Sequence, residues 1–220
     1  MEPPATPPTP SGLREQKKQR ARRHLAATAL RLFLERGFDE VSVAEVAAAA
    51  EVSKPTLFRY FPTKEDLVLD RFADHQGEAA RVVLARADGS TPLRALHAHF
   101  QAGLRAHDPI TGLNDDPEVI AFQRLLYGTA SLRTRLAHYT AREVELLTQA
   151  VEPAYGDGRL GARLAALQLV TVHQELGREN WRKIASGRGA ADAYQEAAGD
   201  AQRAFAVLEQ GLGSGGAHLT

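Results

Sequence analysis

The stretch Arg22–Leu67, RRHLAATALRLFLERGFDEVSVAEVAAAAEVSKPTLFRYFPTKEDL, decides the fold of this chain. It predicts three consecutive helices, because apolar residues recur at helical spacing and each helix has a recognisable end. The first helix is expected over residues 13–36, with Gly37 as its C-terminal stop. The third helix is short, because Pro62 disfavours helical geometry at the residue before it. Together they predict a small packed unit near the N-terminus.

Capping residues mark where the second and third helices begin. Ser42 is followed three residues later by Glu45, which is the capping-box signature, so the second helix starts directly after Ser42. Ser53 is a favourable N-cap for the third helix, and Pro55 is tolerated in its first turn. A tight turn at residues 51–52 therefore joins the two helices.

The remainder of the chain is also expected to be helical, because no segment alternates with the period of a strand or is enriched in β-branched residues. Thr91-Pro92 opens one of these helices, and Asp88-Gly89 ends the helix before it. The fold class is therefore all-α, with about nine helices. After the third helix, one helix is expected over residues 64–87 and the next begins at Pro92. The remaining four are expected over residues 117–128, 131–152, 159–186 and 190–210.

Composition excludes several classes of protein. The 220 residues are 44% hydrophobic, which is enough for a sizeable core, and contain no cysteine, so disulfides and thiolate metal sites are excluded. No apolar run approaches the length of a membrane span, and the N-terminus lacks the pattern of a secretory signal. A soluble cytoplasmic protein that does not bind membranes is expected.

Charge is distributed unevenly although the formal net charge is zero. Residues 1–60 hold ten Lys/Arg against seven Asp/Glu, whereas residues 61–220 hold seventeen against twenty. Residues 14–23 alone contain six basic residues and one acid. Such a cluster is either a solvated helix end or part of a nucleic-acid surface, and its position just ahead of the three-helix unit favours the second interpretation.

The second and third helices form a helix-turn-helix arrangement behind the first, and the second member of such a pair lies in the major groove of DNA. Lys54 and Arg59 can contact base edges or phosphates. The hydroxyl groups of Thr56 and Tyr60 suit phosphate oxygens. The N-terminus of the second helix, at Ser42, can also present N–H groups to a phosphate. The residues expected to touch thymine methyl groups are Pro55 and Phe58.

A resemblance to a known family follows from these residues. Residues 29–38 fit A-x-x-L-F-x-x-x-G-F, and residues 41–67 fit V-S-V-A-E-V-A-x-A-A-x-V-S-x-x-T-L-F-R-Y-F-P-T-K-E-D-L, which resembles the TetR family of repressors. The resemblance implies that Lys64 holds a phosphate. Many members have tyrosine where this chain has Phe58, so the hydrogen bond of that hydroxyl is in doubt here. The predicted DNA-binding residues are Ser42, Ser53, Lys54, Pro55, Thr56, Phe58, Arg59, Tyr60 and Lys64.

Four segments are expected. Composition predicts a disordered arm over the proline-rich residues 1–12 and a flexible tail over the glycine-rich residues 211–220. Between them, the resemblance implies a helix-turn-helix DNA-binding domain over 13–63 and a helical effector-binding and dimerisation domain over 64–210. The helix over residues 159–186 is apolar on two faces, so it is either buried or sandwiched against a second subunit. Members of the family dimerise through their last two helices, and two reading helices about one DNA turn apart would recognise a pseudo-palindromic operator.

An effector pocket is expected between the helices of residues 64–186, lined by aromatic and apolar groups with a few polar ones. The eight histidines form no metal-binding pair, and neither a nucleophile motif nor a glycine-rich phosphate loop is present, so no metal, cofactor or enzymatic activity is predicted. Each pocket candidate is also a typical core residue. The candidates are Phe100, Phe122, Tyr127, Tyr139, His173 and Trp181.

The sequence favours a dimeric transcriptional repressor that a small-molecule effector releases from DNA. A DNA-binding activator, or a regulator that answers to a protein and not to a small molecule, is the alternative. A third hypothesis, an interaction module whose basic N-terminal unit binds an acidic partner, keeps the helical fold without DNA.

Overall fold

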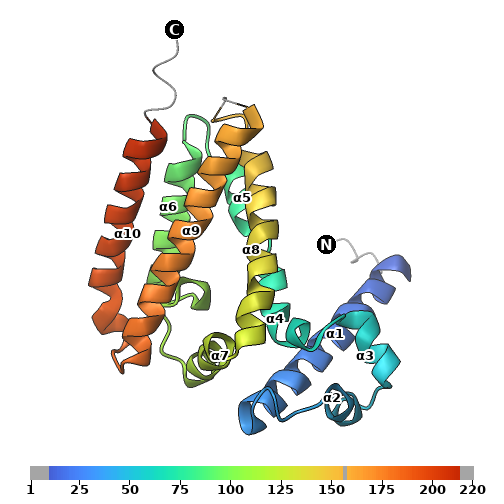
Figure 1. The fold of residues 1–220 in the computed structure, drawn as a ribbon. Coiled ribbons are helices and arrows are strands. Elements are labelled where there is room, and N and C mark those ends of the chain that lie inside the picture. The colour runs from blue at the N-terminus through green and yellow to red at the C-terminus, as the bar shows by residue number, and fades with distance from the viewer. Residues whose placement is uncertain (1–9, 156–157, 214–220) are drawn as a thin grey trace, which may run out of the picture. The chain divides into compact units, whose positions relative to one another are not determined.

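The computed structural model describes residues 10–155 and 158–213, and every regular element in these ranges is a helix (Figure 1). This confirms the predicted all-α class. One short 3-10 helix, η1, joins the α-helices. The elements are α1 (Pro10–Arg36), α2 (Val43–Ala49), α3 (Lys54–Tyr60), α4 (Lys64–His75), α5 (Glu78–Leu84), α6 (Pro92–Arg105), η1 (Pro109–Thr111), α7 (Pro117–Gly128), α8 (Ala130–Val151), α9 (Gly158–Ala185) and α10 (Ala190–Gly213).

The chain forms two compact units. The first comprises the chain up to Arg71 together with Leu125–Leu132, and the second comprises Phe72–Arg124 with the chain from Arg133 onward. The boundary predicted from the sequence, between residues 63 and 64, stays a prediction of where the DNA-binding part ends. In the described ranges, no helix has the length and hydropathy needed to cross a membrane.

The core of the first unit is built from the apolar stripe of α1 and the buried faces of α2 and α3. Leu25, Phe33, Leu57 and Phe61 each expose 1% or less of their surface. Phe33 packs against Phe38, with ring centroids 5.0 Å apart. Because α3 is only seven residues long, Leu57 and the capping residue Phe61 supply most of its anchoring, and the rest of its surface remains outside the core.

The second unit is organised around α10, which packs against both α6 and α9 (Figure 1). Small side chains explain how closely these helices approach one another. Ala193, Ala197 and Ala201 recur every four residues along α10 and are fully buried. From α6, Leu96 and Leu104 fill the core between the helices. The interior of this unit is therefore mainly aliphatic, and Phe100 and Phe205 are among the buried rings that it contains.

Two helix ends differ from the sequence-based expectations. First, α1 begins at Pro10, so residues 10–12 are helical although they were expected in the disordered arm. Residues 1–9 of that arm lie outside the described residues. At the other end of the chain, α10 continues to Gly213, so residues 211–213 belong to a helix and not to the flexible tail, of which residues 214–220 are not described. Both ends were predicted from composition, which is proline-rich at the first and glycine-rich at the second, and composition does not determine the residue at which a helix begins or ends.

The largest difference is the break in the predicted helix over residues 64–87, which consists of α4 and α5. The chain turns at Gly77, whose φ of 76° lies in the left-handed region that glycine adopts at little cost. The Gly77 N–H donates to a Glu143 carboxylate oxygen at 2.7 Å, and Arg81 donates to the Gln76 carbonyl at 3.0 Å. One side chain distant in sequence, Glu143, and one nearby, Arg81, thus satisfy backbone groups that the break exposes.

Candidate DNA-binding site

The outer face of α3 collects the side chains that the sequence predicted for base contacts. Lys54, Pro55, Phe58 and Arg59 are all exposed, whereas Leu57 on the opposite side is fully buried. Phe58 exposes 40% of its surface, which is unusual for a phenylalanine in a small unit. A short helix that is buried on one side and presents two cations and an exposed aromatic ring on the other is suited to a DNA groove.

Aromatic rings hold the two cations of α3 close to the helix. The Lys54 ammonium lies 5.9 Å from the centre of the Phe58 ring, and the Arg59 guanidinium lies 5.8 Å from the Tyr60 ring. Such cation–π contacts are weak at exposed sites, about 0.5–1 kcal/mol. They bias the orientation of the long side chains without preventing their contact with a base or phosphate.

The N-terminus of α2 is fixed by a complete capping box. The Ser42 hydroxyl accepts from the Glu45 N–H at 3.2 Å, and a Glu45 carboxylate oxygen accepts from the Ser42 N–H at 2.8 Å. Arg36, the last residue of α1, donates to the other oxygen of Glu45 at 2.7 Å. Hydrogen bonds from the Ser42 backbone, then from Arg36 and the Ser42 hydroxyl, lower the pKa of Glu45 to about 2.

This capping box predicts a specific pH dependence. Because the folded-state pKa of Glu45 lies below its ordinary value of 4.5, the ionised carboxylate stabilises the fold above that pH, and the contribution is lost as the pH falls toward 2. We expect Glu45→Gln to unfold at lower urea concentration than the wild type at pH 7, with a smaller difference at pH 3. Glu40→Gln, which removes an exposed carboxylate before α2, is the matched control. A difference independent of pH would show that the charge of Glu45 does not matter.

Ser53 and Thr56 form a hydroxyl pair at the start of α3. The Ser53 hydroxyl accepts from the Thr56 N–H at 3.2 Å, and the two side-chain oxygens are hydrogen-bonded at 2.9 Å. Ser53 is exposed and Thr56 is half-buried. Each hydroxyl oxygen keeps further hydrogen-bonding capacity, so a phosphate contact by Thr56 is compatible with its capping role.

Arg22, one of the six basic residues between positions 14 and 23, joins three elements of the first unit. Its Nε donates to Asp70 on α4 at 2.7 Å, and its Nη1 donates to the Tyr60 carbonyl at the end of α3 at 2.9 Å. The guanidinium also lies 4.5 Å from the centre of the Phe61 ring. This arginine therefore fixes the end of α3 to α1 and α4. The Asp70 side chain is only 12% exposed, and a buried carboxylate needs a charged or hydrogen-bonding partner. The sequence did not predict this ion pair, because the burial of Asp70 is a property of the folded chain.

Lys64, expected to hold a phosphate, also has an internal role. Its ammonium donates to the carbonyl of Phe38, after the end of α1, and lies 4.3 Å from the centre of the Phe38 ring and 5.5 Å from that of Phe33. An ammonium has three donors, so the carbonyl uses one and leaves two for a phosphate. Lys64 thus links the start of α4 to the end of α1 whether or not DNA is bound.

The predicted effector-pocket residues differ in their surroundings. Phe100 and His173 meet edge to face, with ring centroids 5.4 Å apart, and Phe122 stacks on Phe72 at 6.1 Å. Trp181 is buried, Tyr139 is half-buried, and Tyr127 belongs to the first compact unit. Phe100 and His173 are therefore two candidates that the fold brings into ring contact.

His173 is the most distinctive of these candidates. Its Nδ1 lies 2.8 Å from the Leu169 carbonyl oxygen, while its Nε2 is buried and makes no hydrogen bond within the described part of the chain. Burial lowers the pKa of His173, so the neutral imidazole is favoured. A neutral ring among Phe100 and Phe205 suits an apolar environment with one polar contact.

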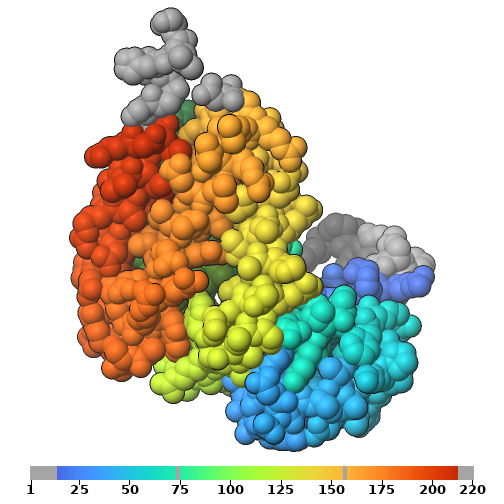
Figure 2. Space-filling model, in the orientation of Figure 1, coloured from blue at the N-terminus to red at the C-terminus, as the bar shows by residue number. Residues whose placement is uncertain are grey.

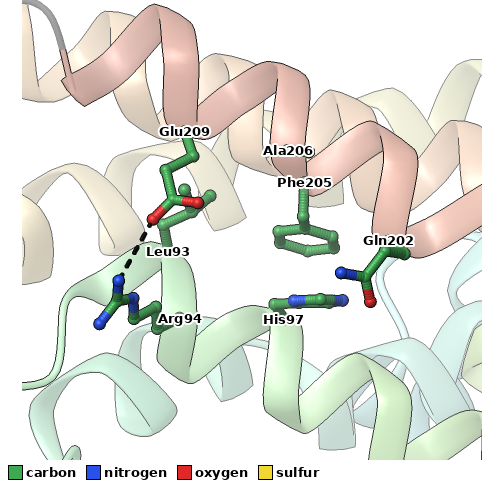
Figure 3. Close-up of a pocket in the computed structure, with 7 residues that line it drawn as sticks. All are labelled: Leu93, Arg94, His97, Gln202, Phe205, Ala206 and Glu209. Atoms are coloured by element: carbon green, nitrogen blue, oxygen red, sulfur yellow. Dashed lines mark ion pairs between the residues drawn. The ribbon is translucent and has the colours of Figure 1, made fainter.

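A hollow lies between α6 and α10, on Phe205, the ring that also contacts His173 (Figure 3). His97 stacks on Phe205 at its base, with ring centroids 4.6 Å apart, and an ion pair of 3.6 Å between Arg94 and Glu209 crosses its rim. None of the six predicted pocket residues lines this hollow. Within the described ranges, no three histidine, aspartate or glutamate side chains are placed to hold a metal ion.

Comparison with known proteins identifies the class of this fold and site. Residues 25–70 match the family model described as bacterial regulatory proteins, tetR family. The HTH-type transcriptional regulator TcmR of Streptomyces glaucescens is 32% identical over 175 residues, covering 78% of this chain and 72% of that protein. The HTH-type transcriptional regulator Mb3439c of Mycobacterium bovis is 31% identical over 173 residues, covering 78% and 77%.

A solved structure with the same fold is that of Thermus thermophilus FadR, a TetR-family transcriptional repressor in complex with lauroyl-CoA. It has a TM-score of 0.52 and 24% identity, and the match covers 86% of this chain and 94% of that one. The chain described here therefore belongs to the TetR family of transcriptional regulators.

Proposed function

We propose that this regulator is a homodimeric repressor that binds a pseudo-palindromic operator through α3 and leaves it when a small-molecule effector binds the second unit. The observation that carries the proposal is the outer face of α3, where Lys54, Pro55, Phe58 and Arg59 are exposed together on a helix anchored by Leu57. An exposed aromatic ring is unfavourable in water and can pack against bases, and the two cations beside it can bind base edges or phosphates.

The geometry around α3 supports binding without rearrangement of the first unit. Arg22 fixes the end of α3, the Ser53 cap fixes its start, and Lys64 fixes the following helix. A reading helix held at both ends loses little conformational freedom on binding, so more of the contact energy is available as affinity.

A homodimer is supported by apolar side chains left exposed on the last two helices. Leu160, Leu164 and Leu167 lie on one side of α9 and expose 70%, 49% and 39% of their surface, and Val207 on α10 exposes 67%. Figure 2 shows α9 and α10 beside each other on one face of the second unit. Two copies packed through this face would form a four-helix bundle with two-fold symmetry, which matches the symmetry of a palindromic operator.

An effector site is supported by the ring cluster around His173. The buried Nε2 of His173 next to Phe100 offers one polar contact in an apolar setting, which is the composition of a small-molecule site. An effector would release DNA by binding better to a conformation whose two reading helices no longer fit the operator. The other predicted residues that stay candidates for contacts with the effector in that conformation are Trp181, Phe122, Tyr127 and Tyr139.

Selection of bound duplexes from a random DNA pool tests the proposal. We expect a palindromic consensus whose two halves lie about one DNA turn apart, roughly 34 Å. The mass of the complex should correspond to an even number of chains. Absence of any sequence preference over random duplex, at several salt concentrations, would contradict DNA recognition by α3.

Two substitutions on α3 separate base reading from phosphate binding. Arg59→Ala should change the base preference at one position of each half-site and cost about 1–3 kcal/mol on the selected operator. Tyr60→Phe, which keeps the ring and the backbone carbonyl that Arg22 uses, should weaken all sequences alike. Mobility shifts on the consensus and on single-base variants provide the measurement. Equal weakening of every sequence by Arg59→Ala would assign that residue to a phosphate.

A further inference from the structure

The hollow between α6 and α10 has an apolar floor with polar groups at both ends (Figure 3). Leu93 from α6 and Phe205 from α10 are buried at this floor, and Ala206 is exposed beside them. The empty space is about 310 Å³, which includes open solvent at the mouth and lies at the lower end of the range for small-molecule sites. The hollow therefore has room for a molecule of about one ring, resting on the floor.

One end of the hollow carries an ion pair that leaves its arginine largely unused. The Nη2 atom of Arg94 lies 3.6 Å from a Glu209 carboxylate oxygen, which is longer than a normal hydrogen bond. The two side chains are 70% and 59% exposed, and ion pairs of this kind contribute little to stability. A guanidinium has five N–H donors, so that of Arg94 is available to another anionic group.

The other end of the hollow, where Figure 3 shows His97 and Gln202, is polar but uncharged. The side-chain nitrogen of Gln101 donates to the Ala198 carbonyl at 3.1 Å and lies 3.3 Å from the Nε2 atom of His97. Because an amide nitrogen only donates, Nε2 accepts, and the proton of the neutral imidazole is on Nδ1. Burial lowers the pKa of His97, although the nearby Glu209 carboxylate opposes this, so the neutral ring is favoured.

The electrostatics of the hollow favour an anion over a cation. Arg94 is the third residue of α6, so it lies in the first turn of that helix, where the helix dipole is positive. Donors also outnumber acceptors, because the guanidinium, the imidazole and the Gln202 amide all carry N–H groups, whereas Glu209 is the one carboxylate among the lining residues. A ligand carboxylate can accept two parallel hydrogen bonds from a guanidinium, which the long contact with Glu209 does not provide.

We propose that this hollow is a binding site for a small carboxylate with a flat apolar body. The carboxylate pairs with Arg94 in place of Glu209, and the apolar body rests on Leu93 and Phe205. The site does not rest on the proposed operator binding, and His173 is not among its lining residues. A ligand there contacts α6 and α10 at once, so it stabilises the folded chain in proportion to its concentration and affinity.

Three probes of one shape and different charge test the ligand class on the full-length protein. Benzoate is the carboxylate, benzamide is its neutral counterpart and benzylamine is the cation. Isothermal titration calorimetry should show saturable binding of benzoate, and the melting temperature should rise with benzoate concentration. Benzamide should bind at least about tenfold more weakly, because it forms no charge-assisted hydrogen bond with Arg94. Absence of saturable benzoate binding, or tighter binding of benzylamine than of benzoate, would contradict the proposal.

Charge variants test whether Arg94 holds the carboxylate. Arg94→Gln should lower benzoate affinity at least about tenfold. Arg105→Gln removes an exposed arginine from the other end of α6 and should bind benzoate like the wild type. Glu209→Gln should strengthen benzoate binding, because it removes the carboxylate that competes for Arg94. Equal losses in Arg94→Gln and Arg105→Gln, or weaker benzoate binding by Glu209→Gln, would contradict the proposed contact.

A variant that fills the hollow tests its location without changing any charge. Ala206→Leu places a larger apolar side chain in the lining and should lower benzoate affinity at least about tenfold. Ala191→Leu adds the same atoms at an exposed position of α10 outside the hollow and should leave the affinity unchanged. Circular dichroism should show equal helix content for both variants. If Ala206→Leu bound benzoate as tightly as the wild type, the ligand would bind elsewhere and the hollow would not be its site. None of these outcomes depends on whether the wild type binds an operator.

Discussion

Gly112→Ala is expected to destabilise the second unit by roughly 3–5 kcal/mol, which is enough to unfold a marginally stable domain. A Cβ atom built on Gly112 would lie 1.9 Å from the carbonyl oxygen of Gly177 on α9 and 3.0 Å from the backbone nitrogen of Trp181. Both neighbours are backbone atoms, which cannot rotate away. The φ of Gly112 is also 73°, so a side chain adds strain independent of space.

The Gly112 contact fixes the connection between α6 and α7 onto α9. In the same region Asn180 donates to the Thr111 carbonyl at 2.9 Å, in the buried interior. Asp115 accepts from the N–H of Ala190 at the start of α10 at 2.9 Å. If the alanine forced this connection away from α9, both polar contacts would be weakened as well, which is why the expected cost exceeds that of conformational strain alone.

Gly89→Ala is the matched control for this experiment. Gly89 has a similar φ of 78°, but no atom lies within 4 Å of the position that a Cβ would occupy there, so only the strain of about 1–2 kcal/mol should be observed. Urea unfolding followed by circular dichroism measures both variants against the wild type. An equal loss of unfolding free energy in the two variants would mean that α9 moves to accommodate the methyl group. The close backbone contact at Gly112 would then not matter for stability.

The caps around the helix-turn-helix explain why this part of the fold could be predicted from sequence. The start of α2 is determined by the capping box of Ser42 and Glu45, and the start of α3 by the Ser53 cap. The hydrogen bonds of both caps join residues three positions apart. Pro62 determines where α3 ends in the same local way. Local signals of this kind are read directly from the chain, and the predicted helices over residues 117–128 and 190–210 also begin where the structure places α7 and α10.

Other features depend on residues distant in sequence and were missed for that reason. The turn at Gly77 separates α4 from α5 because Glu143, sixty-six residues later, accepts its N–H. A glycine inside an apolar periodic segment does not by itself predict a break. The role of Arg22 was hidden in the same way, because only the folded chain brings Asp70 and the Tyr60 carbonyl to one of six neighbouring basic residues.

The effector site shows the limit of residue types as a guide. Aromatic side chains are suited to both a core and a pocket, so Phe100 and Phe122 carried no signal that separates the two. In the structure both are buried, each against another ring. A pocket is defined by space between side chains, and that space depends on how helices pack and not on any short motif.

Leu164→Asp is expected to raise the dissociation constant of the homodimer at least about 100-fold, which corresponds to about 3 kcal/mol. Leu164 lies at the centre of the exposed leucines of α9, between Leu160 and Leu167, and would be buried in the proposed four-helix bundle. Two-fold symmetry places one aspartate from each protomer in that bundle, so two carboxylates lose water without gaining a cation. Sedimentation equilibrium measures the change in mass.

Loss of the dimer should also lower operator affinity, because a single α3 contacts only one half-site and each protomer must then bind separately. Leu84→Asp is the matched control, since Leu84 exposes 71% of its surface at the end of α5, outside α9 and α10. It changes the same residue type and the same charge, yet it should leave both the mass and the operator affinity close to wild type. If Leu84→Asp dissociated the dimer and Leu164→Asp did not, the subunits would associate through the face that contains α5, and the spacing of the two α3 helices would have to be derived from that arrangement instead.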